Sequence, residues 1–162
     1  MKTSTKLKFV NKAPEGTTAP YRYVMKPNPD FKIPSNHLLT PHWHPNSNEI
    51  TTCIKGEGTV TIIAPNTKYP GNPGTAIPTT YPLKEGDSVF LQQGYFHYFM
   101  NTGNEDFEID LTFDKKDFDI LTLSEVISLL PDNIKLAAVN SKPDNPIIPY
   151  EKIEVDKKEI VY

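Results

Sequence analysis

A chain of 162 residues with 37% hydrophobic and 23% charged residues has the composition of one folded domain and not of a disordered polypeptide. No apolar run approaches the roughly 20 residues of a transmembrane helix, and a net charge of −3 argues against a nucleic-acid partner. The single cysteine, Cys53, excludes an internal disulfide and a cysteine-rich zinc site, while 16 prolines favour short strands and ordered loops over long helices.

The first 35 residues predict an arm with short strands ahead of the main domain. Residues 6–10 and 20–25 alternate apolar and polar side chains, and a turn is expected at residues 27–30. Residues 1–6 are charged, but no apolar core of a signal peptide follows them. We therefore expect a cytoplasmic protein that does not associate with a membrane.

Between residues 37 and 113 the pattern predicts a series of short strands separated by turns. The expected strands are residues 37–44, 49–54, 59–63, 81–83, 88–91, 97–100 and 107–113. Such closely spaced short strands are typical of a sandwich or barrel. A proline-rich loop is expected at residues 64–80, and its length favours a functional role, as a ligand mouth or an interface.

The pattern becomes helical after residue 120. Leu121, Leu123, Val126 and Leu130 recur at helical spacing, and Pro131 is expected to end one helix and open a second. Either Thr122 or Ser124 could cap the first helix. The chain thus divides into an arm (1–35), a β-barrel (36–113), C-terminal helices (117–140) and an extended tail (141–162), the tail serving as an edge strand or a partner-binding segment.

The segment around residue 43 carries a metal-site hypothesis. His42 and His44 are one residue apart on an extended chain, so both imidazoles face the same side. Glu49 begins the next expected strand, and a short corner would bring all three side chains to one point. A pair of histidines alone is also compatible with two satisfied polar residues on a strand.

Two spaced motifs connect this segment with a distant strand. His42, His44, Glu49 and Gly56 fit the pattern HxH, four residues, Glu, six residues, Gly. Further along, Gly86, Gly94, His97 and Asn101 stand at the spacings of a second motif. In these residues the chain resembles the cupin superfamily, whose members usually have a proline where this chain has Gln92 and a glycine where it has Asn36. The sequence at residues 41–50 and 123–131 is similar to that of the germin, spherulin and oxalate decarboxylase branch.

This resemblance covers about residues 36–140 and implies a jelly-roll β-barrel, the double-stranded β-helix of cupins, in an all-β protein with short C-terminal helices. It also implies four metal ligands, His42, His44, Glu49 and His97. Three neutral imidazoles and one carboxylate suit one divalent transition metal, and we expect manganese first, then iron, with nickel, cobalt or zinc also compatible. Asn101 is expected to form a turn and not to bind metal.

The residues around the ligands suggest a substrate pocket. Thr51 and Cys53 share a strand face with Glu49, and Phe99 shares one with His97. Oxalate decarboxylase-like sequences place an arginine three residues before the first histidine, and germins an asparagine; this chain has Leu39 there, and Arg22 is its only arginine. The resemblance further suggests Asp117 or Asp119 as an acid on a loop that closes over the site.

Two functions therefore stand side by side. The first is a metal-dependent oxidoreductase or decarboxylase acting on a small carboxylate, with oxalate itself disfavoured by Leu39. The second is a non-catalytic module that binds a small ligand, like spherulin and seed-storage relatives. In either case we expect a homodimer or a higher homo-oligomer, with strand 107–113 and the C-terminal helices as candidate interfaces.

Overall fold

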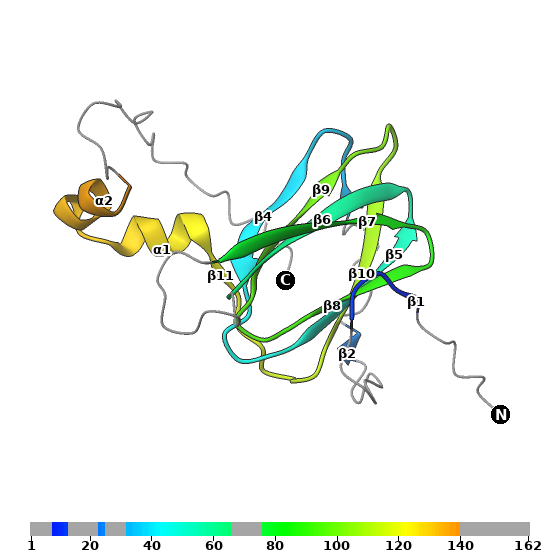
Figure 1. The fold of residues 1–162 in the computed structure, drawn as a ribbon, viewed down its shortest axis with the longest axis horizontal. Coiled ribbons are helices and arrows are strands. Elements are labelled where there is room, and N and C mark those ends of the chain that lie inside the picture. Colours follow the sequence, from blue (N-terminus) through cyan, green and yellow to red (C-terminus); the bar gives the residue numbers. More distant parts are fainter. Residues whose placement is uncertain (1–7, 13–22, 25–31, 66–75, 140–162) are drawn as a thin grey trace.

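A computed structural model describes residues 8–12, 23–24, 32–65 and 76–139 of the chain (Figure 1). These residues form a mostly β structure of two sheets and two short helices. The first sheet contains, in spatial order, β1 (Lys8–Phe9), β8 (Asp87–Leu91), β5 (Glu49–Lys55), β10 (Phe107–Phe113) and β2 (Tyr23–Val24), with β3 (Lys32–Ile33) also paired to β10. The second contains β11 (Leu121–Thr122), β4 (Leu38–Trp43), β9 (Phe96–Asn101), β6 (Glu57–Ala64) and β7 (Ile77–Lys84).

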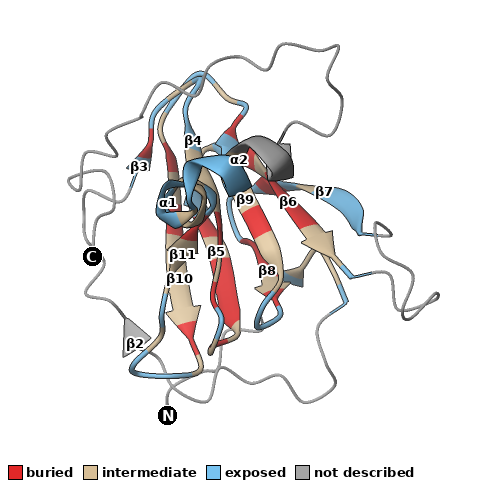
Figure 2. Ribbon diagram, turned by 90° about the vertical axis from the view of Figure 1, so that its left-hand side faces the viewer, coloured by how far each residue is buried: buried red, intermediate tan, exposed pale blue. Residues whose placement is uncertain are grey.

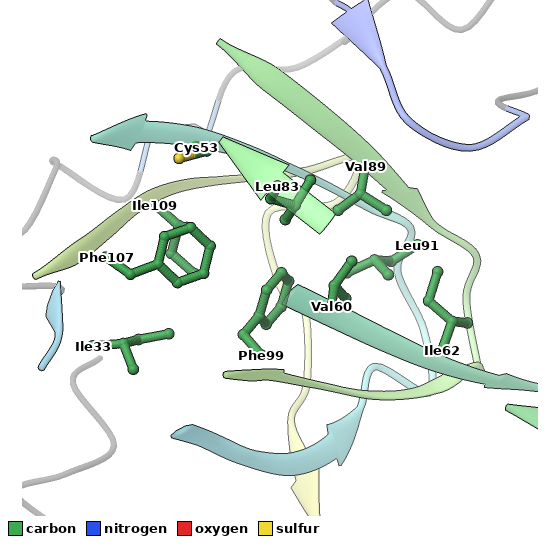
Figure 3. Packing of buried hydrophobic residues seen from close by; sticks show 10 residues of the cluster. All are labelled: Ile33, Cys53, Val60, Ile62, Leu83, Val89, Leu91, Phe99, Phe107 and Ile109. Carbon is green, nitrogen blue, oxygen red and sulfur yellow. The ribbon is translucent and has the colours of Figure 1, made fainter. Parts of the chain in front are cut away.

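The two sheets face each other across one hydrophobic core (Figure 3). The core forms because side chains alternate between the two faces of each strand. In β9 the buried residues His97, Phe99 and Asn101 are separated by the more accessible Tyr98 and Met100. Strands of both sheets contribute to the cluster, whose members are Ile33, Cys53, Val60, Ile62, Leu83, Val89, Leu91, Phe99, Phe107 and Ile109. The expected mostly β architecture is therefore confirmed.

The expectation of a closed barrel is wrong, because the two sheets are not closed into one. Among the described residues, no strand belongs to both sheets, and β7 lies at the end of the second sheet. This strand carries Pro78 and Pro82, whose nitrogens have no hydrogen to donate to a further strand. The prolines therefore suit an edge position and work against closure on that side.

The prolines are also the reason why the first half of β7 was predicted as a loop. Residues 77–80 were expected in the long loop, but they pair with residues 61–64 of β6 as the first half of β7. β10, the strand expected at an interface, lies inside its sheet, between β5 on one side and the short β2 and β3 on the other, so an interface there would use its face and not a free edge. Arg22, residues 66–75 of the expected loop and the tail 141–162 lie outside the described residues.

Helices α1 (Leu123–Leu129) and α2 (Asp132–Val139) extend to one side of the sheets (Figure 1). Leu121 was expected to belong to the helical pattern, but Leu121 and Thr122 form β11, which pairs with β4 at Trp43 and His42. The side chain of Thr122 accepts a hydrogen bond of 3.1 Å from the backbone of Glu125 and so caps α1, one of the two caps expected. The side chains of α1 are not buried (Figure 2). Neither described helix is long and apolar enough to cross a membrane.

The motif positions explain the turns between strands. Gly56, Gly86 and Gly94 have φ angles of 77°, 85° and 80°, which lie in the left-handed region. At Gly56 a Cβ atom would also stand 2.5 Å from the carbonyl oxygen of Asp106, so any side chain would displace the β9–β10 connection. Asn36 occupies the remaining motif position and has φ of 64°, a conformation that asparagine tolerates better than most residues.

Candidate metal centre

Four side chains from both sheets converge between them. His42 lies in β4, His44 follows that strand, His97 lies in β9, and Glu49 is the first residue of β5 in the opposite sheet. One ligand-type atom from each lies within 4.8 Å of all the others. Their exposed fractions are only 4%, 3%, 1% and 1% for His42, His44, Glu49 and His97. The structure thus brings together the four residues that the sequence proposed as ligands.

A bulge in β4 directs His42 into this cluster. Leu39 is opposite Phe99 and His42 is opposite His97, so three steps along β4 match two steps along β9. The extra residue resets the alternation, and both Leu39 and His42 face the interior although they are an odd number of residues apart. As a result, the rings of His42 and His97 lie with their centroids 4.3 Å apart.

Each histidine is oriented by a backbone carbonyl group. Nδ1 of His42 donates to Thr40 at 2.7 Å, Nδ1 of His97 donates to Tyr95 at 2.9 Å, and Nδ1 of His44 donates to Asp119 at 2.8 Å. A carbonyl oxygen can only accept, so these contacts assign the ring proton to Nδ1 in all three residues. Nε2 of each neutral ring is then a free lone pair, as metal ligation requires.

The two carboxylate oxygens of Glu49 have different neighbours. Its Oε1 accepts a short hydrogen bond from the hydroxyl of Thr51, which is fully buried on the same face of β5. Its Oε2 lies 2.9 Å from Nε2 of His44 and 3.5 Å from Nε2 of His97. Thr51 was proposed as pocket lining; in the structure its hydroxyl fixes the orientation of Glu49.

The electrostatics of the cluster fit a divalent cation. Burial alone would raise the pKa of Glu49, but the imidazoles of His44 and His97 hold it well below its ordinary value. Burial, followed by the neighbouring His97, lowers the pKa of His42 to about 4, so this ring is neutral over a wide pH range. Burial also acts to lower the pKa of His44, but the carboxylate of Glu49 outweighs it and the net shift is upward.

Three atoms at the centre have no hydrogen-bond partner in the described part of the chain. Nε2 of His44, Oε2 of Glu49 and Nε2 of His97 are buried, and their mutual contacts do not have hydrogen-bond geometry. Unpaired buried polar atoms are costly in a folded protein. A metal ion with nitrogen and oxygen ligands would satisfy all three at once, so the residues present fit such an ion.

The segment that contains Asp117 and Asp119, the two acids suggested for a closing loop, lies over His44. We call residues 114–120 the strap. Asn46 donates to the carbonyl of Asp117 at 3.0 Å and to the carboxylate of Asp119 at 2.9 Å, and its own amide oxygen accepts from the backbone of Asp119 at 2.9 Å. Phe118 of the strap stacks on Phe113, with ring centroids 3.8 Å apart, and both rings contact His44 edge-on.

The base of the strap is anchored by Asp114. Its carboxylate accepts from the hydroxyl of Ser47 at 2.7 Å, from the backbone of Asn48 at 2.9 Å and from the side chain of Asn48 at 2.6 Å. Burial would raise the pKa of Asp114, but these donors lower it overall. In the sequence, this contact could have been suspected from the polar residues between His44 and Glu49. Their side chains bind the strap and not the metal.

The remaining pocket candidates lie in the core. Phe99 is fully buried, with its ring centroid 6.0 Å from that of His97, and Leu39 is partly buried opposite it. Burial raises the pKa of the Cys53 thiol to about 11, and the thiol contacts the carbonyl groups of Lys55 and Gly56, so it is poorly suited to be a nucleophile. Asn101, expected in a turn, is instead the last residue of β9, and its side chain braces the following turn by donating to Ile33 and Glu105, each at 2.7 Å.

Comparison with known proteins identifies relatives of this arrangement. A family model described as Cupin matches residues 31–143. A comparison with curated proteins finds no match. Oxalate decarboxylase of Lactobacillus farciminis, in a complex with formate, is similar in structure with a TM-score of 0.59 and 19% sequence identity, over 69% of this chain and 30% of that enzyme.

Oxalate decarboxylase of Bacillus subtilis is similar to the same degree. Its structure at pH 4.6 has a TM-score of 0.60 and 21% identity, over 70% of this chain and 27% of that enzyme. A study of the Mn(II) centres of the same enzyme provides a second structure with a TM-score of 0.60, of which 28% is covered. The chain therefore spans 30% or less of the length of these enzymes, and the likeness concerns the fold.

Proposed function

The chain belongs to the cupin family, and from this premise we propose that it binds one divalent transition metal through His42, His44, Glu49 and His97. The observation that carries the proposal is the set of buried, unpartnered atoms on His44, Glu49 and His97 that face one another. Manganese is the first candidate, because the similar enzyme of Bacillus subtilis contains Mn(II) centres. Iron is the second, and nickel, cobalt and zinc are compatible with the ligand types.

We further propose that the protein is a metal-dependent oxidoreductase or decarboxylase that acts on a small carboxylate. The support is the structural similarity to oxalate decarboxylases, one of them determined with formate. A bound metal would supply Lewis acidity toward the carboxylate oxygens. The chain itself would hold the metal through three oriented imidazoles and one oriented carboxylate, in a buried site beside Phe113 and Phe118.

Oxalate is disfavoured as the substrate. Leu39 is partly buried against the core, next in the chain to the bulge that directs His42, and offers neither a charge nor a hydrogen bond. A dianion such as oxalate needs such partners when it leaves water. We expect a manganese-loaded sample to release neither formate nor peroxide from oxalate at enzyme-like rates; release of either would contradict this part of the proposal.

One observation supports the alternative of a non-catalytic, ligand-binding cupin. A closing loop that supplies an acid needs a free carboxyl group, and Asp119 is engaged twice, through its carboxylate with Asn46 and through its carbonyl with His44. The bonds with Asn46 and His44 hold the strap in place, and they would have to break before the loop could move. In this alternative the metal orients a bound ligand and no turnover follows.

Elemental analysis of the untagged protein, purified without added metal, tests the metal proposal, and anomalous scattering at the site identifies the ion. The matched variants are His97→Ala, which removes a ligand, and His37→Ala, which removes an exposed histidine outside the cluster. We expect metal in the wild type and in His37→Ala but not in His97→Ala. Dioxygen consumption and carbon dioxide release with a panel of small carboxylates, phenols and sugars then separate a catalyst from a binder.

We also propose that residues 1–162 form a single cupin domain that self-associates. Exposed apolar side chains on the helices support this, since Leu129 is 76% exposed and Ile134 is 45% exposed. Light scattering on the full chain tests the proposal. A monomer at all concentrations would contradict it, and a dimer that dissociates in Leu129→Lys would support it.

A further inference from the structure

A cavity that is separate from the metal centre lies between the edges of the two sheets. Its volume is about 160 Å³, and none of the four candidate ligands lines it. The second sheet contributes β6 and β7, and the first contributes β8 and the residues that follow β1. The wall residues used below are Lys12, Ile62, Tyr81, Phe90, Gln92 and Tyr95.

The cavity has the size and the lining of a site for one small ring. In size it is close to the space of about 150 Å³ that accommodates a benzene molecule in a buried cavity, but Lys12, Thr79 and Gln92 are exposed and open it to solvent. Tyr81 and Tyr95 bring two aromatic residues to the wall, beside the aliphatic side chain of Ile62. Aromatic walls favour a planar guest through stacked or edge-on contacts.

The wall also contains the positive charge of Lys12. Lys12 lines the cavity, and no carboxylate pairs with it in the part of the chain that the structure describes. Its segment is fixed in place, because the Asn11 side chain donates to the carbonyl of Phe90 at 2.7 Å and accepts from its amide at 2.9 Å. The side chain of Gln92 lines the same space and adds hydrogen-bonding capacity. These groups complement an anion more than a neutral molecule.

The cavity is a neighbour of the metal centre through two residues. Ile62 is directly opposite His97 on the paired strands β6 and β9, so both side chains face the interior. Tyr95, whose backbone carbonyl orients His97, also lines the cavity. A guest would therefore lie beside the metal centre without replacing any of its ligands.

We propose that this cavity binds a small monocyclic aromatic carboxylate, with benzoate as the simplest member of the class. The ring packs between Tyr81 and Tyr95, and Lys12 supplies the positive charge for the carboxylate. This site does not use the metal, so it stands or falls separately from the proposed function.

Methyl NMR on the full chain tests the proposal, with benzoate as the probe and Ile62 as the reporter. Titration is done on the chelated protein and on the zinc-loaded protein, since zinc does not broaden the spectrum. We expect saturable shifts of the Ile62 methyl signals in both forms, with Ile33 in the distant β3 as the unaffected control. Acetate, which has the charge but no ring, is expected to cause no such shifts.

Two kinds of variant locate the site. Ala64→Phe fills the cavity from β6 and Thr79→Phe fills it from β7, and each should abolish the benzoate shifts. Lys12→Gln should weaken binding by up to about fivefold, the range for an exposed ion pair. Lys84→Gln is the matched control, because Lys84 is an exposed lysine of β7 that does not line the cavity.

Each outcome of these experiments either supports or contradicts the proposed benzoate site. Binding that survives chelation and is lost in both filling variants, with unchanged thermal unfolding, supports the proposal. Binding that requires zinc would place benzoate on the metal and overturn it, as would equal binding in a folded filling variant or no binding at all. None of these results depends on whether the purified protein contains metal or turns over a substrate.

Discussion

The backbone carbonyl of Asp119 accepts a 2.8 Å hydrogen bond from Nδ1 of His44, a residue 75 positions earlier in the chain. The strap therefore determines which nitrogen of His44 is free for a metal. Asn46 holds the strap at three points, and so a residue with no contact to the cluster controls the orientation of one ligand.

Asn46→Ala should weaken metal binding without unfolding the protein. The substitution removes the side-chain bonds to Asp117 and Asp119 and lets the carbonyl of Asp119 move away from His44. Loss of groups that orient a ligand typically costs 10–100-fold in metal affinity, and we expect about tenfold for this indirect change. Competition titration with a fluorescent chelator measures it. Asn104→Ala, an exposed asparagine of the β9–β10 turn, is the control, and equal affinities in both variants would contradict the prediction.

Metal should raise the melting temperature of the wild type. A ligand at 100 times its dissociation constant stabilises the folded state by about 2.7 kcal/mol, which corresponds to roughly 5–10 °C for a chain of this size. Differential scanning calorimetry with and without Mn²⁺ measures the increase. His37→Ala should retain it and His42→Ala should lose it, because only His42 belongs to the cluster. An increase in His42→Ala as large as in the wild type would place the metal elsewhere.

Thr51→Val should lower metal affinity by about tenfold or more. Valine keeps the shape of threonine, but it removes the hydroxyl that orients Oε1 of Glu49 and leaves that buried oxygen without its donor. Thr52→Val is the matched control, because the Thr52 hydroxyl bonds to Ser88 at 2.9 Å and not to a ligand. Isothermal titration calorimetry compares the two, and a larger loss in Thr52→Val would refute the role given to Thr51.

The metal-free protein should lose stability as the pH falls from 6.5 to 4.5. The folded-state pKa of His42 is about 4, lowered by burial and by His97, whereas a histidine in an unfolded chain titrates near 6.5. In this window the unfolded state binds a proton that the folded state does not, so the free energy of unfolding decreases with pH. Between pH 6.5 and 4.5 this loss amounts to about 2 kcal/mol.

His44 and Glu49 do not obscure this slope. His44 has a raised pKa, so its stabilising contribution is complete below pH 6.5 and is lost only as the pH rises through the folded-state value. Glu49 has a lowered pKa, and its contribution is lost only as the pH falls below about 4.5. Urea unfolding of the chelated protein at several pH values measures the slope. His42→Gln should flatten it, and an unchanged slope would show that another group is responsible.

The side chains of the site could be proposed from the sequence because their types and spacings are specific. His42 and His44 share a face of a strand, and His97 stands at a fixed distance from Gly94. The groups that orient them could not be proposed in this way. The carbonyls of Thr40, Tyr95 and Asp119 belong to every residue type equally, so only the folded chain reveals which of them accept from the histidines.

The fold departs from expectation where prolines and short pairings decide it. Pro78 and Pro82 concealed β7, since proline is compatible with a strand only where its missing donor is not needed, and an edge satisfies that condition. β11 contains only Leu121 and Thr122, and its pairing with β4 depends on tertiary contact and not on local preference. Closure of the barrel likewise depends on edges that lie far apart in the chain.

The division of the ligands between the sheets bears on how fast the protein unfolds. Three histidines belong to the second sheet or its end, and Glu49 belongs to the first, so a bound metal would be a cross-link that exists only after the two sheets have packed. Interactions that form after the transition state slow unfolding and leave the folding rate almost unchanged. We therefore expect the metal to act mainly on kinetic stability, extending the lifetime of the folded state in denaturant while refolding proceeds at nearly the metal-free rate.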